Sequence, residues 1–144
     1  MSTDAIPRVL WIDDDAPRST VQIPGVELQM AYSCADAIKK LATHTPPDVI
    51  VVDISLSLDG WRADPLTEPG IHLMRHLRET LGPRQRIISF SHYLDTYRHA
   101  LLDDTGVKER FQKRDFTLKS LLAHLRAPGP TSFGSKSLTT ENDR

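Results

Sequence analysis

Polar residues able to carry out chemistry follow four short candidate strands of the sequence, at the point where each one ends. They are a run of three aspartates, a fourth aspartate, a serine and a lysine. In chain order these residues are Asp13, Asp14, Asp15, Asp53, Ser91 and Lys113. Open α/β sheets bind their ligands outside the carboxyl ends of the strands, near the point where the strand order reverses. We therefore expect these side chains to share one site.

The chemistry of such a cluster follows from its charge. Carboxylates brought together repel one another, and keeping each of them charged is costly without a compensating cation. Mg²⁺ prefers oxygen ligands and is usually held by one or two carboxylates and several waters. A carboxylate also attacks phosphorus to form an acyl phosphate, with a lysine and a hydroxyl near the phosphoryl oxygens. Any one aspartate alone is better explained as a solvated loop start, but four matched strand ends favour magnesium-assisted phosphoryl transfer.

Short apolar runs without alternation are typical of strands that are buried on both faces of a parallel sheet. Three such runs cover residues 9–12, 49–52 and 87–90. Residues 26–30 alternate between apolar and polar, which indicates an edge strand half open to water. Residues 110–112 are a weaker strand candidate.

Apolar residues at helical spacing fill the intervals between these strands. The stripes are Ala35, Ile38, Leu41 and Ala42 after the candidate cap Ser33; Ile71, Met74, Leu77 and Leu81; Leu94, Tyr97 and Leu101; and Leu118, Leu121, Leu122 and Leu125. Alternating strands and helices predict a doubly wound parallel sheet. Between Asp15 and Val26, two prolines and a glycine interrupt a segment with few apolar residues, so the first helix is expected to be short or absent.

The composition argues against some classes of partner and location. Lys and Arg together number 18 against 19 Asp and Glu, which argues against a basic face for nucleic acid. The longest apolar run, residues 49–52, is far too short to cross a bilayer, and no signal peptide is expected from the first residues. The single Cys34 cannot form an internal disulfide, which favours a reducing, cytoplasmic location. Its place at a helix start would favour a lowered thiol pKa, although a redox role is not the expected one.

Four segments of the sequence together resemble the receiver domain of two-component response regulators. They are RVLWIDDD, PPDVIVVDISL, RIISFSH and GVKERFQKRDF, and the resemblance covers about residues 8–126. It implies an α/β fold with a doubly wound, five-stranded parallel sheet in the flavodoxin-like order 2-1-3-4-5. We expect one receiver-like domain over residues 1–127 and a flexible C-terminal tail over 128–144.

The resemblance also implies a role for each polar residue. Asp53 falls on the phosphoacceptor, and Ser91 and Lys113 fall on the hydroxyl and the lysine that assist the transfer. The implied magnesium ligands are Asp13, Asp14, Asp53 and the backbone carbonyl of Ser55. Of the acidic pair after the first strand, the second residue would bind the ion directly and the first largely through water.

The function that the resemblance implies is a phosphorelay signalling switch. A histidine kinase or phosphotransfer protein would phosphorylate Asp53, and a downstream protein partner would receive the output. The chain would then be no enzyme beyond the self-catalysed transfer to its own aspartate, and it would bind neither nucleic acid nor membrane.

Two alternatives stay open at this point. Arg110 stands where the family often has Tyr or Phe, and Arg114 stands where the family usually has proline after the lysine. Both departures favour a receiver-like interaction domain that no longer depends on phosphate. The second alternative is a dehalogenase-type phosphatase with Asp13 as nucleophile, because a strand followed by aspartates also fits the start of that family. Asp53 would then have no role.

Three further hypotheses concern regions outside the cluster. Trp61 in the long loop 59–68 is a candidate lid over the acidic pocket. His72 and His76 lie four residues apart on a predicted helix, where a solvated face is favoured over a metal pair. A first helix too short for its share of the sheet would leave an apolar face beside the last helix, unless the connecting loop folds over the gap. That face predicts a homodimer or a docked partner.

Overall fold

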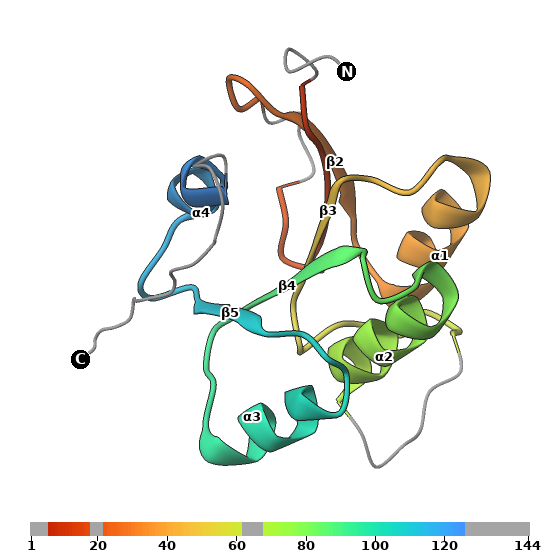
Figure 1. Ribbon diagram of the computed structural model, residues 1–144, viewed down its shortest axis with the longest axis vertical. Coiled ribbons are helices and arrows are strands. Elements are labelled where there is room, and N and C mark those ends of the chain that lie inside the picture. Colours follow the sequence, from red (N-terminus) through yellow and green to blue (C-terminus); the bar gives the residue numbers. More distant parts are fainter. Residues whose placement is uncertain (1–5, 18–21, 62–67, 126–144) are drawn as a thin grey trace.

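The computed structural model describes residues 6–17, 22–61 and 68–125 (Figure 1). The strands are β1 (Arg8–Ile12), β2 (Glu27–Ala31), β3 (Val49–Val52), β4 (Arg86–Ser91) and β5 (Glu109–Gln112). The helices are α1 (Cys34–Thr43), α2 (Pro69–Leu81), α3 (Thr96–Asp103) and α4 (Leu118–Leu125). None of these described helices is both long and apolar enough to span a bilayer. The predicted tail lies outside the described residues, so the division after residue 127 stays a prediction.

The strands form one parallel sheet in the order β2-β1-β3-β4-β5, which confirms the predicted fold class and strand order. The chain runs from β1 out to the edge strand β2 and then back across to β3, so the order reverses between β1 and β3. Figure 1 shows α4 by itself on one side of the sheet and the other three helices on the opposite side. The carboxyl ends of all the strands lie at one edge because the strands are parallel.

Side chains of the central strands alternate between two hydrophobic clusters, one on each face. On β1, Leu10 and Ile12 enter the cluster with α1, α2 and α3, whereas Val9 and Trp11 enter the cluster with α4. The strand β3 is buried along its whole length because strands flank it and helices cover it, which explains its continuous β-branched run. A shift of register by one residue would exchange the two faces, so burial determines the register.

The connection from β1 to β2 contains no helix in its described part, residues 13–17 and 22–26, which agrees with the expected loss of the first helix. The segment runs over the α4 face instead. Ala16 is buried in the cluster there, and the Tyr32 hydroxyl donates to the carbonyl oxygen of Pro17 at 2.9 Å. The connection therefore takes over part of the cover that a helix would provide.

The cover is incomplete between the connection and α4. A cavity of about 210 Å³ remains there, lined by Pro7, Val9, Val26, Asp48, Val49, Arg86 and Leu122. On the same face, the edge strand β2 keeps Leu28 and Met30 only partly buried. A partly covered apolar face beside the last helix is what the sequence predicts, and the homodimer or partner inferred from it stays a prediction.

Ser33 caps α1 as the sequence predicts. Its Oγ accepts from the backbone N–H of Asp36 at 3.0 Å, and the Asp36 carboxylate accepts from the backbone N–H of Tyr32 at 2.9 Å. The two bonds satisfy donors around the start of the helix reciprocally. Ala42, the last residue of the predicted stripe, is exposed in the last turn of α1.

The stripe predicted for the third helix is wrong in two positions, because Leu94 precedes the helix and Tyr97 lies on its exposed side. The helix α3 begins at Thr96 after its cap Asp95, whose carboxylate accepts from the backbone N–H of Arg98 at 2.8 Å. Tyr97 then points outward and is 57% exposed, while Leu102 is fully buried. In a helix this short, apolar residues four positions apart can lie on the buried side or on the exposed side. Only the packing of α3 on the sheet decides which side of the helix is buried.

The cavity beside α4 predicts that a larger side chain at Val9 stabilises the protein. In Val9→Ile the added carbon enters empty space, which should raise the free energy of unfolding by about 0.8 kcal/mol. Val51→Ile is the matched control, since Val51 is fully buried in the same cluster and does not line the cavity. There the extra group should cost about 1–3 kcal/mol. Urea unfolding measures both changes. An equal loss of the free energy of unfolding in the two variants would show that the cavity does not accept the added carbon.

Candidate functional site

The sheet brings two of the acidic residues together at its carboxyl edge. Ile12 and Val52 are register partners in the neighbouring strands β1 and β3, so Asp13 and Asp53 leave the sheet side by side. Both aspartates are almost completely buried, with exposures of 1% and 2%, whereas Asp14 is half-buried. The proximity expected from the strand ends is thus produced by the register of the central strands.

Three carboxylates converge at this edge and share one ammonium group. Ligand oxygens of Asp13, Asp14 and Asp53 lie within 4.8 Å of one another. Lys113 Nζ donates to Asp13 Oδ2 at 2.5 Å and to Asp53 Oδ2 at 3.0 Å. The third aspartate of the run, Asp15, is exposed and donates its backbone N–H to Asp13 Oδ1 at 2.9 Å.

Burial and charge act against each other on these groups. Burial raises the pKa of Asp53 above its ordinary range, while Lys113 opposes this shift and Asp13 adds to it. Burial would lower the pKa of Lys113, but its hydrogen bonds and its attraction to the two carboxylates prevail and raise the pKa. Lys113 therefore carries its charge at neutral pH, and one cation faces three carboxylates.

The donor set fits Mg²⁺. The excess of negative charge that one ammonium leaves favours a further cation, and carboxylate oxygens are the ligands that Mg²⁺ prefers. Both oxygens of Asp13 already accept hydrogen bonds, one from Lys113 Nζ and one from the Asp15 backbone N–H. Asp14 is half-buried, so its carboxylate is open to an ion that keeps part of its water.

Two serines complete the set of predicted site residues. Ser91 is buried; its Oγ accepts from the backbone N–H of Ile54 at 3.1 Å, and its carbonyl accepts from the backbone N–H of Lys113 at 2.7 Å. Ser55 is exposed and donates its backbone N–H to Asp53 Oδ1 at 3.2 Å. All the predicted site residues therefore lie at one edge of the sheet. The metal-binding role of the Ser55 carbonyl and the catalytic role of Ser91 stay predictions.

Gly70 is a site residue that the sequence analysis did not single out. It lies in the first turn of α2, and its N–H donates to the carbonyl oxygen of Ile54 at 2.8 Å. A Cβ at this position would lie 2.0 Å from the carbonyl oxygen of Asp53 and 2.5 Å from Ile54 Cα, so only glycine permits the approach. A glycine directly after Pro69 at a helix start is the signal that could have revealed it.

The segment after Asp53 is attached to the start of α1. The carbonyl oxygen of Ser57 accepts from the backbone N–H of Cys34 at 2.9 Å, and that of Leu58 accepts from the backbone N–H of Ala35 at 3.2 Å. These N–H groups lie in the first turn of α1, where backbone donors have no acceptor within the helix. The loop after Asp53 is therefore held on both sides, by α1 and by α2.

Trp61 packs on α2. Its ring centroid lies 5.2 Å from that of His72 and 5.5 Å from that of His76, edge to face in both pairs, and the indole also packs against the core. In the described part of the loop, Trp61 thus lies against the helix, and the lid hypothesis finds no support there. The two imidazoles are half-buried, which corrects the predicted solvated face.

The pKa of the Cys34 thiol is raised, which contradicts the lowered pKa expected from its place at a helix start. The thiol is buried and lies 3.8 Å from the carbonyl oxygen of Pro69. Burial, with a smaller contribution from the Asp14 carboxylate, raises its pKa from 9.0 to about 12. The loss of hydration of a thiolate outweighs the favourable helix terminus, because no water reaches the sulfur.

No family model and no curated protein matches the chain. Solved structures do match it over most of its length. A two-component response regulator from Clostridium difficile has a TM-score of 0.61 and 22% identity, and the match covers 84% of this chain and 93% of that chain. A CheY-like response regulator receiver domain protein from Methanospirillum hungatei has a TM-score of 0.62 and 18% identity, over 84% and 91% of the two chains.

A third structure is a response regulator protein from Burkholderia pseudomallei with a phosphorylated aspartic acid, calcium ion and citrate. It has a TM-score of 0.60 and 23% identity, and the match covers 84% of this chain and 67% of that chain. These likenesses, together with the strand order, show that the chain has the fold of response regulator receiver domains.

The close approach of α2 predicts that Gly70→Ala damages both the fold and the site. The added methyl would overlap the backbone of Asp53, so the free energy of unfolding should fall by about 3 kcal/mol. Gly82→Ala is the control: the backbone there, with φ 93° and ψ 172°, is strained for alanine and should cost about 1–3 kcal/mol, but the added carbon meets open space. Only the first variant should weaken Mg²⁺ binding in an NMR titration. Equal Mg²⁺ affinity in both variants would show that Gly70 does not contribute to the site.

The buried thiol predicts slow labelling and an alkaline loss of stability. In the folded protein Cys34 should react with a disulfide reagent only as fast as the core opens, because the thiol is covered and protonated. Its folded pKa lies above the ordinary value, so the stabilisation is complete below pH 9.0 and is lost as the pH rises towards about 12. Cys34→Ala should flatten this loss in urea unfolding. Rapid labelling of the folded wild type would contradict the assignment.

Proposed function

We propose that this chain is a phosphorelay signalling switch that accepts a phosphoryl group on Asp53 from a histidine kinase or phosphotransfer protein. The observation that carries the proposal is the ion-paired acidic cluster at the carboxyl edge of a receiver fold. Three carboxylates and one ammonium are the groups that an acyl phosphate and a divalent cation need around them. The fold shared with response regulators supports the same conclusion.

Asp53 is the proposed nucleophile. One of its carboxylate oxygens attacks the phosphorus of a phosphohistidine, and the new P–O bond forms as the P–N bond breaks. The imidazole, protonated on its other nitrogen, leaves as a neutral ring with the electron pair of the broken bond. Lys113 opposes the rise in the pKa of the buried Asp53 carboxylate before the transfer and lies close enough to pair with a phosphoryl oxygen afterwards. The Ser91 hydroxyl is the proposed second donor to the phosphoryl group.

Magnesium is the proposed cofactor. When bound, the ion supplies positive charge to the carboxylates and to an oxygen of the phosphoryl group. Its proposed ligands are Asp13, Asp14, Asp53 and the backbone carbonyl of Ser55. We assign the direct contact to Asp14 and a water-mediated one to Asp13, since both oxygens of Asp13 already accept hydrogen bonds.

The output is proposed to pass through contact with another protein. The net charge of -1 leaves no excess of basic residues for nucleic acid, which supports a protein partner. The partly covered face beside α4 is a proposed place for that partner or for a second copy of the chain. We propose a cytoplasmic location, in which the protonated thiol of Cys34 stays reduced, and a receiver-like domain over 1–127 with a tail over 128–144.

A receiver-like interaction domain that does not depend on phosphate is the second candidate, and two observations favour it. Arg110 stands where receiver domains often have an aromatic residue and is tied to α3. The described residues contain no cis peptide bond, so Lys113 is joined to Arg114 in trans. In that case the acidic cluster would bind a cation without accepting phosphate.

Intact mass after incubation with acetyl phosphate and Mg²⁺ tests the proposal. The wild type should gain one phosphoryl group per chain, labile to base and hydroxylamine as acyl phosphates are. Asp53→Asn should gain none, and an excess of chelator should abolish the gain in the wild type. Asp14→Ala should lose more Mg²⁺ affinity than Asp13→Ala, because a direct ligand contributes more than a contact through water.

Two outcomes separate the candidate functions. A folded wild type that binds Mg²⁺ and gains no mass would favour the interaction domain. Labelling of Asp53→Asn but not of Asp13→Asn, with steady turnover of an aryl phosphate, would favour the dehalogenase-type phosphatase.

Lys113→Ala should still accept phosphate but lose the phosphate-dependent change in partner binding, since the Lys113 ammonium is the group that responds to the new charge.

A further inference from the structure

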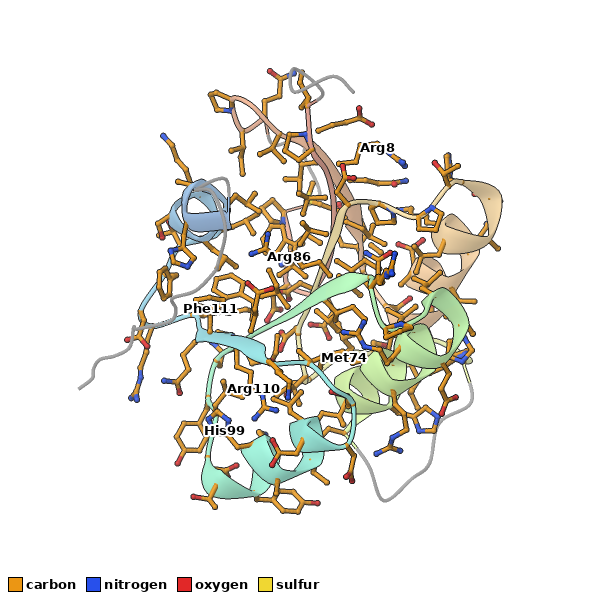
Figure 2. All side chains as sticks on the ribbon, viewed as in Figure 1. Arg8, Met74, Arg86, His99, Arg110 and Phe111 are labelled. Carbon is orange, nitrogen blue, oxygen red and sulfur yellow. The ribbon has the colours of Figure 1, made fainter. Side chains whose placement is uncertain are left out.

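Arg110 ties β5 to α3. Its Nε donates to the carbonyl oxygen of Val107 at 2.8 Å, and its Nη2 donates to Asp103 Oδ1 at 2.8 Å. Its Nη1 donates to His99, at 3.1 Å to the ring Nδ1 and at 3.3 Å to the carbonyl oxygen. The Arg110 side chain is only 15% exposed. Figure 2 shows it reaching from β5 towards His99 on α3.

The helix α3 has little apolar anchorage of its own. All of its residues are described, and among them Leu102 is the one buried side chain. Along α2, by contrast, the buried side chains are Ile71, Leu73, Met74 and Leu77. Because apolar burial is the main force that holds a helix on a sheet, polar ties carry a larger share of the anchorage of α3 than of α2. An element with so few buried contacts is also the one that opens at the lowest cost.

The bond between Arg110 and His99 exists only while His99 is neutral. A guanidinium has donors and no acceptor, so the ring Nδ1 must offer its lone pair. Protonation would turn this nitrogen into a donor and set a second positive charge against the guanidinium. The charged groups that face His99 are Arg110 from β5 and Asp95 and Asp103 from α3. Burial and Arg110 together lower the pKa of His99, and the two aspartates only partly oppose this.

The remaining ionic contact of Arg110 does not replace the lost bond. Asp103 is 70% exposed, so water screens its attraction to the guanidinium. A second arginine, Arg98, ties α3 to Glu68 Oε2 at 2.8 Å and involves no histidine. Loss of the bond to the His99 ring would therefore loosen α3 at the side that faces β5, where the longer bond to the His99 carbonyl oxygen and the screened pair with Asp103 remain. The side that faces α2 stays attached.

We propose that Arg110 positions α3 on the sheet and that uptake of a proton by His99 releases this side of the helix. The position of α3, and of the exposed Tyr97 that it carries, then depends on pH. The inference is independent of the phosphoryl transfer proposed above, since it involves no residue of the acidic cluster.

Amide hydrogen exchange in α3 of the unphosphorylated protein, read at Leu101 and Leu102 and corrected for the intrinsic rate at each pH, tests the proposal. In the wild type, α3 should exchange faster relative to α2 as the pH falls below 6.5, the ordinary pKa of histidine. Arg110→Met keeps the apolar stem and loses every donor, so α3 should exchange roughly tenfold faster even above that pH. His99→Gln offers an acceptor that does not titrate and should abolish the pH dependence while retaining the protection.

Two further variants act as controls. Arg86→Met removes a bidentate pair with Glu109, at 2.8 and 2.7 Å, from the neighbouring position on β5 and should leave α3 unchanged. Arg98→Met should loosen α3 but keep its pH profile. The proposal is overturned if Arg86→Met loosens α3 as much as Arg110→Met does, or if His99→Gln keeps the wild-type pH profile. Should Arg110→Met fail to fold, the comparison of wild type with His99→Gln decides by itself.

Discussion

Lys113 lies between two buried carboxylates, and the organisation of the carboxyl edge depends on this double ion pair. Its ammonium reaches from the end of β5 across β4 to Asp13 and Asp53, which come directly after β1 and β3. Burying two neighbouring carboxylates without a partner would cost several kcal/mol for each ion. One ammonium does not balance the three carboxylates that converge with Asp14, however. The negative charge left over favours a divalent cation at this edge of the sheet.

Backbone packing holds Asp53 in place on the side away from Lys113. The start of α2 approaches so closely at Gly70 that no side chain fits between the helix and the strand end. The loop after the strand is hydrogen-bonded to the first turn of α1. Beside this rigid part lies α3, which has one buried side chain and is held by arginine contacts. The molecule therefore combines a fixed site with a neighbouring helix whose attachment is electrostatic, and such an attachment responds to charge and pH where apolar packing does not.

The opposite face of the sheet is shaped by a connection too rich in proline to form a helix. The described parts of the segment between β1 and β2, residues 13–17 and 22–26, contain no helix and cover only part of the face. A cavity remains beside α4, and side chains of the edge strand stay partly open to water. Loss of one helix thus changes this face without disturbing the acidic edge, because the register of the central strands is set by burial on both of their sides.

The sequence by itself determined the strands, the doubly wound order and the polar residues at the strand ends, because these depend on local periodicity and on motifs such as the run that ends at Asp53. The local spacing of residues does not indicate which distant segments come into contact or which polar groups become buried away from water. Only the tertiary structure decided that Gly70 touches the Asp53 backbone, that Tyr97 points outward and that Cys34 has a raised pKa. The hydrogen bonds from Arg110 to α3 also follow only from the tertiary structure, because a bond between separate elements forms only once the fold has placed them side by side.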